Sequence, residues 1–176
     1  YQNGANFSAS TYQIGVKFNN SIYRLDSNFT KTTYKNRADF SGSIFCNEVY
    51  FGSNEKDKEF SRFINYAPKF YTRTHNKNTL FTSPNNNFTV ECNGNYSIEL
   101  NTQNIPISCN LLTYNQKEFF ENKFQEIEKI NNKILRVKNC KEKESLSKRL
   151  RSLTLEIHSW REKITTVKVE GDAIEG

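Results

Sequence analysis

The chain has 176 residues, enough for one domain of ordinary size with a core of its own. Only 35% of the residues are apolar, but 14 Phe and 9 Tyr are among them, so we expect a core built largely from rings and exclude a chain that is disordered throughout. The 25 basic and 19 acidic side chains give a net charge of +6, which favours acidic partners. No run of about 18 apolar residues occurs, so we expect no transmembrane segment in this chain.

The two ends of the chain are polar and give little indication of structure. Residues 1–10 are expected to form a loose entry segment, and residues 171–176 a short acidic tail. The sequence contains no methionine, not even at position 1, which indicates either a mature product whose leader was removed or a fragment of a longer protein.

Residues 11–110 show the short apolar and polar alternation that is typical of β-strands. The clearest example runs from Tyr12 to Phe18, and Asn19-Asn20 then predicts a tight hairpin turn into a strand over 22–25. No internal repeat of useful length is recognised. Further strands are predicted at 29–34, 38–45, 48–51, 69–73 and 79–82.

Two segments interrupt or complete this β region. Residues 55–66 place apolar side chains three and four apart, which predicts a short helix ended by Pro68. A three-stranded meander is predicted after it, with Asn93-Gly94 as one of its turns and Pro106 in an edge strand, because proline cannot donate to a ladder. The strands of that meander are predicted at 88–92, 96–100 and 105–109.

Between Pro106 and Gly171 the chain has neither glycine nor proline, and two apolar stripes follow each other at helical spacing. The first stripe runs from Phe120 to Val137, after a predicted cap at Asn115, and the second from Leu146 to Ile164. The nine-residue step between the stripes would put them on opposite sides of one continuous helix, so we predict an antiparallel helical hairpin over 116–163 with its turn near 139–144.

After the hairpin, residues 165–170 alternate β-branched and polar side chains, which predicts a return strand. The sequence therefore predicts a single α+β domain over 11–170. In that domain a mainly antiparallel, aromatic-rich β part (11–110) carries the helical hairpin and the return strand.

The four cysteines, Cys46, Cys92, Cys109 and Cys140, are even in number and form no Cys-x-x-Cys motif, which favours disulfides over a zinc site. On the hairpin hypothesis Cys109 and Cys140 lie at opposite ends of one helix, about 36 Å apart. That pair is therefore disfavoured, and Cys92 with Cys109 is favoured. Four buried thiols in a cytosolic protein are the competing interpretation.

The sequence predicts no catalytic residue, no metal ligand set and no cofactor. The two histidines, His75 and His158, have no acid or nucleophile at a telling spacing, and solvated or packing roles are expected for both. The densest basic group lies on the second predicted helix and is the predicted partner-binding face, although a solvated helix surface is the simpler interpretation. It consists of Lys148, Arg149, Arg151, Arg161 and Lys163.

These features favour a non-enzymatic structural or interaction subunit that lies outside the cytoplasm or at the cell surface and binds a protein partner or a second copy through the hairpin or a sheet edge. The first alternative is an intracellular, basic module that binds nucleic acid, in which rings stack bases and cations follow phosphates. The second alternative is an enzyme whose site is assembled from distant residues.

Overall fold

The computed structural model describes residues 4–53, 59–93 and 96–167. They belong to two compact units, a β unit that contains the chain up to Leu111 and again from Ile164, and a helical unit over Leu112–Lys163. The fold class is α+β, with a pair of helices towards the C-terminal end of the chain.

The strands of the β unit are two residues long, and straight segments this short alternate with corners. They are β1 (Ala5–Asn6), β2 (Thr11–Tyr12), β3 (Val16–Lys17), β4 (Ile22–Tyr23), β5 (Ser27–Asn28), β6 (Thr33–Tyr34), β7 (Ala38–Asp39), β8 (Ile44–Phe45), β9 (Val49–Tyr50), β10 (Arg62–Phe63), β11 (Tyr71–Thr72), β12 (Lys77–Asn78), β13 (Leu80–Phe81) and β14 (Asn110–Leu111).

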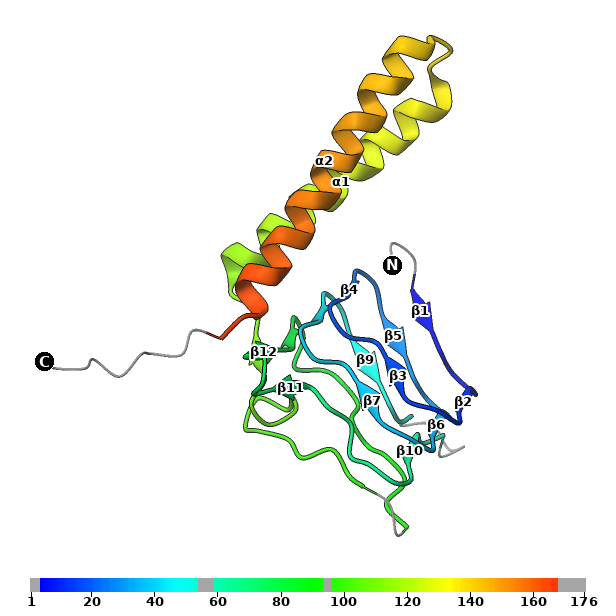
Figure 1. Cartoon of the computed structure of the whole chain (residues 1–176), viewed down its shortest axis with the longest axis vertical. Helices are drawn as coiled ribbons and strands as arrows, with labels where there is room; N and C mark the ends of the chain where they lie inside the picture. Colours follow the sequence, from blue (N-terminus) through cyan, green and yellow to red (C-terminus); the bar gives the residue numbers. More distant parts are fainter. Residues whose placement is uncertain (1–3, 54–58, 94–95, 168–176) are drawn as a thin grey trace, which may run out of the picture. The chain divides into compact units, whose positions relative to one another are not determined.

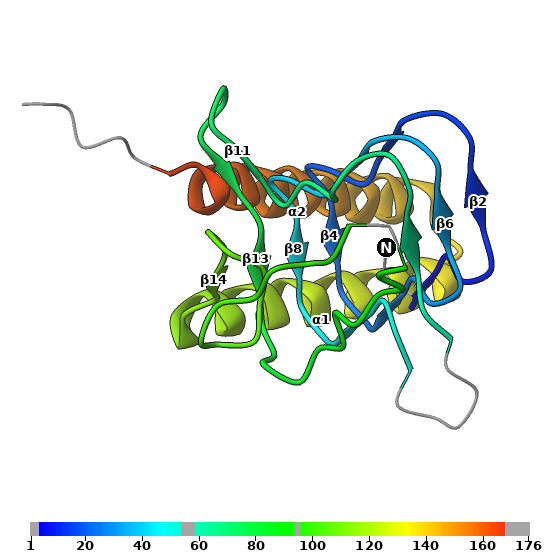
Figure 2. The same cartoon turned by 90° about the horizontal axis from the view of Figure 1, so that it is seen from below.

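The prediction of a mainly antiparallel sheet is wrong, because every strand pair except β11 with β12 is parallel. Residues pair with others 22 positions further on, as Ala5 does with Ser27 and Ser27 with Val49. The chain therefore winds as a four-sided parallel solenoid, each coil stacking on the last. The sides are β1-β5-β9, β2-β6-β10, β3-β7 and β4-β8-β13-β14; Figure 1 shows the first and Figure 2 the last.

The core of the solenoid consists of rings, as predicted, and they are ordered in four columns. Within each column the rings stack on those of neighbouring coils, with centroids 4.6 to 5.9 Å apart. Between columns they meet edge to face, as Phe18 meets Phe29 at 5.3 Å. The columns are Phe7-Phe29-Phe51-Phe88, Tyr12-Tyr34-Phe63, Phe18-Phe40-Phe70 and Tyr23-Phe45-Phe81.

In the first two coils a second inward position lies two residues before each ring, and it holds Ala, Ser, Thr or Val. Several of these are buried hydroxyls that donate to a carbonyl one coil earlier: Thr32 to Phe7 at 3.0 Å, and Ser43 to Phe18 at 2.8 Å. These bonds satisfy carbonyls at the corners that no strand ladder reaches.

The corners between sides come in two lengths, which explains the 22-residue coil. In the first two coils the rings are alternately five and six residues apart. Each five-residue step contains one residue in the left-handed region, namely Ala9, Asn20, Lys31 and Gly42, at φ of 52° to 68°. A Cβ added to Gly42 would also lie 2.5 Å from the Asn20 side-chain oxygen, so a substitution there would force the Asn20 side chain to move.

This winding overturns the local predictions that assumed reverse turns. Asn19-Asn20 forms a corner rather than a hairpin turn, and the segment predicted as a loose entry contains β1. Residues 54–58 of the predicted helix over 55–66 lie outside the described residues, but β10 and the bridge of Ser61 to Val90 occupy its second half.

The predicted meander is also absent from the described residues. Its three segments form only isolated bridges, among them an antiparallel bridge of Leu100 to Pro106. Gly94, half of its predicted turn, lies outside the described residues. Pro106 is therefore not in an edge strand of a sheet.

The helical unit consists of α1 (Tyr114–Arg136) and α2 (Cys140–Thr165), and α2 ends two residues beyond the unit. α1 begins earlier than predicted, because Thr113 and Gln116 form a reciprocal capping box where Asn115 was expected to cap. No helix in the described part of the chain has both the length and the apolar character to cross a bilayer.

The two predicted stripes form the seam between α1 and α2. Phe120, Phe124, Ile127 and Ile130 are buried on α1, and Leu153 and Ile157 on α2. The link of residues 137–139 needs no glycine, because Val137 is extended and the Asn139 side chain accepts from the Lys141 and Glu142 amides, at 2.9 and 3.3 Å, and caps α2.

Only a short part of the predicted return strand lies in the described residues, and it forms a single bridge. Thr165 ends α2, Thr166 makes one antiparallel bridge to Lys77, and the Val167 amide donates to the Asn76 carbonyl at 2.7 Å. Residues 168–170 lie outside the described residues. The chain thus rejoins the β unit after the helices.

Candidate functional site at the tip of the helical hairpin

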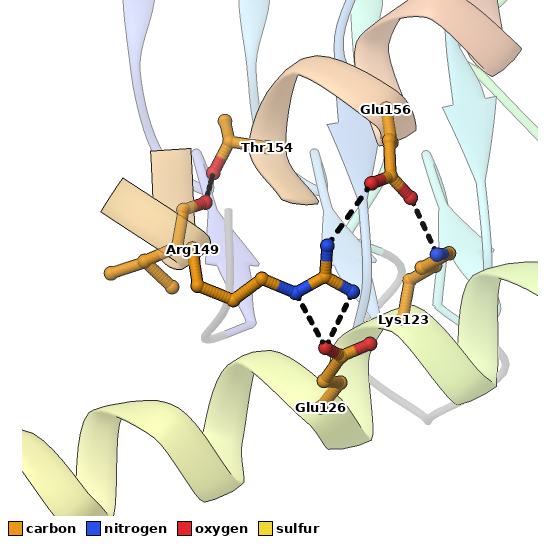
Figure 3. Close-up of polar contacts among 6 residues, drawn as sticks. Lys123, Glu126, Arg149, Thr154 and Glu156 are labelled. Carbon is orange, nitrogen blue, oxygen red and sulfur yellow. Dashed lines mark hydrogen bonds and ion pairs between the residues drawn. The ribbon is translucent and has the colours of Figure 1, made fainter. Parts of the chain in front are cut away.

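Ion pairs between α1 and α2 fix the two helices in antiparallel order (Figure 3). Lys123 on α1 lies 2.5 Å from Glu156 on α2, and Arg149 on α2 lies 2.8 Å from Glu126 on α1. Arg149 also reaches Glu156 at 3.5 Å, so the four charges form one network. The hydrogen bond from Lys123 is the main cause that holds the pKa of Glu156 below its usual value.

Two of the predicted basic-face residues are engaged in ion pairs within the helical unit. Arg149 is engaged with α1, and Lys148 pairs with Glu144 one turn earlier on α2 at 2.8 Å. Arg161 is buried, with 8% of its surface exposed.

The other two members of the predicted face are exposed. The Lys163 ammonium lies 5.6 Å from the centre of the Trp160 ring, and Arg151 is exposed as well. At about 100° per residue, the five predicted positions are distributed around the whole helix. The structure therefore does not gather them on one surface.

The structure does gather basic side chains at the other end of the hairpin, where α1 passes into α2. Residues 129–148 contain seven basic and two acidic side chains, a net charge of +5, whereas the rest of the hairpin, 112–128 and 149–163, has six of each. We call residues 129–148 the tip. At 1.5 Å per residue they all lie within about 12 Å of the link along the helix axes.

Most cations of the tip have no counter-ion. Lys133 lies 3.1 Å from Glu142, and Lys148 is paired with Glu144. Five others are exposed and form no ion pair within the described residues: Lys129, Arg136, Lys138, Lys141 and Lys143. This cluster was not predicted from the sequence, although a count of charge along residues 107–170 reveals it.

An exposed apolar side chain lies among these cations. Leu135, one residue before the end of α1, has 82% of its surface exposed and is therefore not buried in the apolar seam. The tip contains no aromatic residue. Its exposed chemistry is therefore cationic and aliphatic.

The disulfide prediction is wrong, because all four cysteines are free thiols. Cys109 is 2% exposed in the ring core, and burial raises the pKa of its thiol to about 12. Cys92 and Cys140 are exposed, and Cys140 is the first residue of α2, at the tip. Stacked rings stabilise the β unit without a cross-link.

Candidate metal ligands do not gather in the part of the chain that the structure describes. No three His, Cys, Asp or Glu side chains among those residues gather as metal ligands. His75 and His158 are both exposed residues. The pKa of His158 is lowered by partial burial of its imidazole and by the positive charge of Arg161.

The β unit has a hollow of about 1000 Å³ along β3 and β7, bordered by the exposed rings of Tyr66 and Tyr96. The Arg37 guanidinium lies 4.9 Å from the centre of the Tyr66 ring, and the Asp39 carboxylate accepts from the Ser41 hydroxyl at 2.6 Å. These groups are engaged with neighbours on the wall rather than aimed at a common point. The hollow offers no reactive arrangement.

No family of known proteins, no curated protein and no solved structure matches this chain.

Proposed function

We propose that this protein is a non-catalytic binding subunit, in which the solenoid is a rigid scaffold and the tip of the helical hairpin is the contact surface for an anionic partner. The observation that carries the proposal is the uneven charge of the hairpin. Its larger part is neutral, with equal numbers of basic and acidic side chains, while the tip has a net charge of +5 and five cations that form no ion pair within the described residues. Unpaired cations held close together attract an anionic surface strongly and with a steep dependence on salt.

The structure of the hairpin itself supports this role. The seam and the ion-pair network hold the tip side chains on two ordered helices, so little backbone freedom is lost when a partner binds. The free thiols remove one argument for an oxidising compartment, and a location outside the cytoplasm stays a prediction.

Binding of a generic polyanion, heparin, tests the proposal. The tip variant combines Lys138→Glu, Lys141→Glu and Lys143→Glu, and a control with the same change of net charge combines Lys17→Glu, Lys35→Glu and Arg73→Glu, all exposed in the β unit. We expect the tip variant to lose at least about 30-fold in affinity and the control less than about fivefold, measured by titration calorimetry at low salt. Equal losses in both variants would show that only net charge matters and that the tip is not the contact surface.

A further inference from the structure

We infer that the anionic partner of the tip is the surface of a phospholipid bilayer that contains acidic lipids. This inference rests on the proposed function and names its partner. It follows from two kinds of side chain that occur together at the tip, namely cations without counter-ions and one exposed aliphatic group.

The cations surround the end of the hairpin rather than one side of it. Arg136 ends α1, Lys138 lies in the link, and Lys141 and Lys143 are in the first turn of α2. Lys133 and Lys129 lie on the same face of α1 as Arg136, one and two turns back respectively. A flat anionic surface that meets the end of the hairpin therefore faces cations contributed by both helices and by the link.

Leu135 favours a bilayer over nucleic acid as that surface. Proteins that bind single strands stack bases on aromatic rings, and residues 129–148 contain none. An aliphatic side chain with 82% of its surface exposed gains by entering the boundary between headgroups and acyl chains. Neighbouring Lys and Arg side chains can extend their charged ends to the phosphates while Leu135 is inserted.

The affinity that the tip cations add for an acidic bilayer is sufficient for reversible attachment. Each Lys or Arg near an acidic leaflet adds about fivefold in affinity, so five cations add at most a few thousandfold over a neutral bilayer. A rigid hairpin presents them together, which removes much of the ordering cost that a disordered basic segment has. The contact is therefore expected to be strong at low salt and weak at high salt.

The experiment is vesicle binding by the whole chain. We compare vesicles of neutral phosphatidylcholine with vesicles that also contain about 30% phosphatidylserine, at about 0.05 M and about 0.5 M salt. The wild-type chain should co-sediment with the acidic vesicles at low salt and be released at high salt. The tip variant should lose at least about 100-fold in affinity, and the matched variant of the β unit less than about threefold.

A second pair of variants tests insertion of Leu135. Leu135→Ser should lower the affinity for acidic vesicles by about tenfold, because the inserted apolar surface is lost. Leu155→Ser is the control, since Leu155 is 71% exposed on α2 outside the tip, and its affinity should stay unchanged. An environment-sensitive dye on Cys140, in a Cys92→Ser background, should shift to the blue only with acidic vesicles.

Several results would overturn the inference. Equal binding to neutral vesicles, or equal losses in the tip and control variants, would remove the role of the tip cations. Tip-dependent binding of heparin or of a single-stranded oligonucleotide without vesicle binding would assign another anionic partner and leave the proposed function intact. If neither polyanion nor vesicle binds in a tip-dependent way, the proposed function fails as well.

Discussion

Buried polar side chains in the β unit are placed by the stacking of the coils. Thr79 is fully buried, and its hydroxyl lies within hydrogen-bonding distance of the carbonyls of Phe40 at 2.9 Å and Phe70 at 2.7 Å. A hydroxyl at the inward position two residues before a ring satisfies a corner carbonyl. The frequent Ser and Thr of this chain are thus partly core residues.

At the residue scale, Cys109 predicts a loss of stability at alkaline pH. Burial raises the pKa of its thiol to about 12 in the folded chain, from an ordinary value of 9.0. Between these values the unfolded chain loses the proton and the folded chain keeps it, so stability is fully present below pH 9 and falls as pH rises towards 12. The free energy of unfolding should therefore fall by about 1.4 kcal/mol in total between pH 8 and pH 10, most of it above pH 9, measured by urea unfolding with a reducing agent present.

The controls for this prediction are two substitutions. Cys109→Ala should be less stable overall but lack the slope between pH 9 and pH 10, whereas Cys92→Ala, at an exposed thiol, should keep it. The window ends at pH 10, because burial also raises the pKa of Tyr34 and hydrogen bonding to Glu48 raises that of Tyr50 to about 12. An unchanged slope in Cys109→Ala would show that another group causes it.

At the scale of the element, the unit of the solenoid is a stretch of eleven residues, or half a coil. It reads ANFSASTYQIG, VKFNNSIYRLD, SNFTKTTYKNR and ADFSGSIFCNE from residue 5 to residue 48. In each stretch the third and eighth residues are rings of the core, the sixth is Ser or Thr, and the fifth has a positive φ.

The fifth residue of each eleven-residue stretch has a positive φ, but only one of the four, Gly42, is a glycine. Introducing glycine at another of these positions therefore gives a prediction. Ala9 is exposed and has a φ of 58°, which strains any residue with a Cβ. Ala9→Gly should raise the free energy of unfolding by about 0.5–1 kcal/mol, measured by urea unfolding. Ala67→Gly is the matched control, since exposed Ala67 is not among the residues with positive φ, and it should lower stability by a similar amount. Destabilisation by both would mean that the corner is not strained.

The elements that could be predicted are those with a long, uninterrupted period. The helical hairpin follows from two stripes at spacings of three and four, and the ring-rich core from composition. The direction of the strands was mispredicted, because the period-two pattern from Tyr12 to Phe18 spans a corner. Ile14 belongs to that pattern but is 78% exposed, and a corner of a solenoid has the same Asn-rich composition as a reverse turn.

The candidate site could be predicted only in part for a related reason. A basic surplus on the helices follows from counting charges. Which cations remain unpaired depends on contacts across the seam, such as that of Arg149 with Glu126, and these require the register of α1 against α2. The tip therefore shares only Lys148 with the basic face that was predicted from sequence density.

At the scale of the whole molecule, the two compact units are expected to open separately. Strands β5, β6 and β8 of the second coil are each hydrogen-bonded to a neighbouring strand on both sides, and the rings that they enclose are fully buried. The hairpin has one seam between two helices and exposed ion pairs, which contribute little. Amides of the second coil should therefore exchange hydrogen only through global unfolding, and amides of α1 and α2 at a lower free energy, as mass spectrometry of exchange can measure. A single exchange free energy for both units would show instead that the chain opens as one.

The eleven-residue unit gives the solenoid an approximate screw symmetry. Half a coil carries the chain through half a turn and, with coils about 4.8 Å apart, advances it by about 2.4 Å. A duplication or loss of eleven residues would therefore keep every ring in a column but exchange opposite sides of the solenoid for all that follows. Two such units restore the original sides. The solenoid can therefore change its length by whole coils while every later strand stays on its own side.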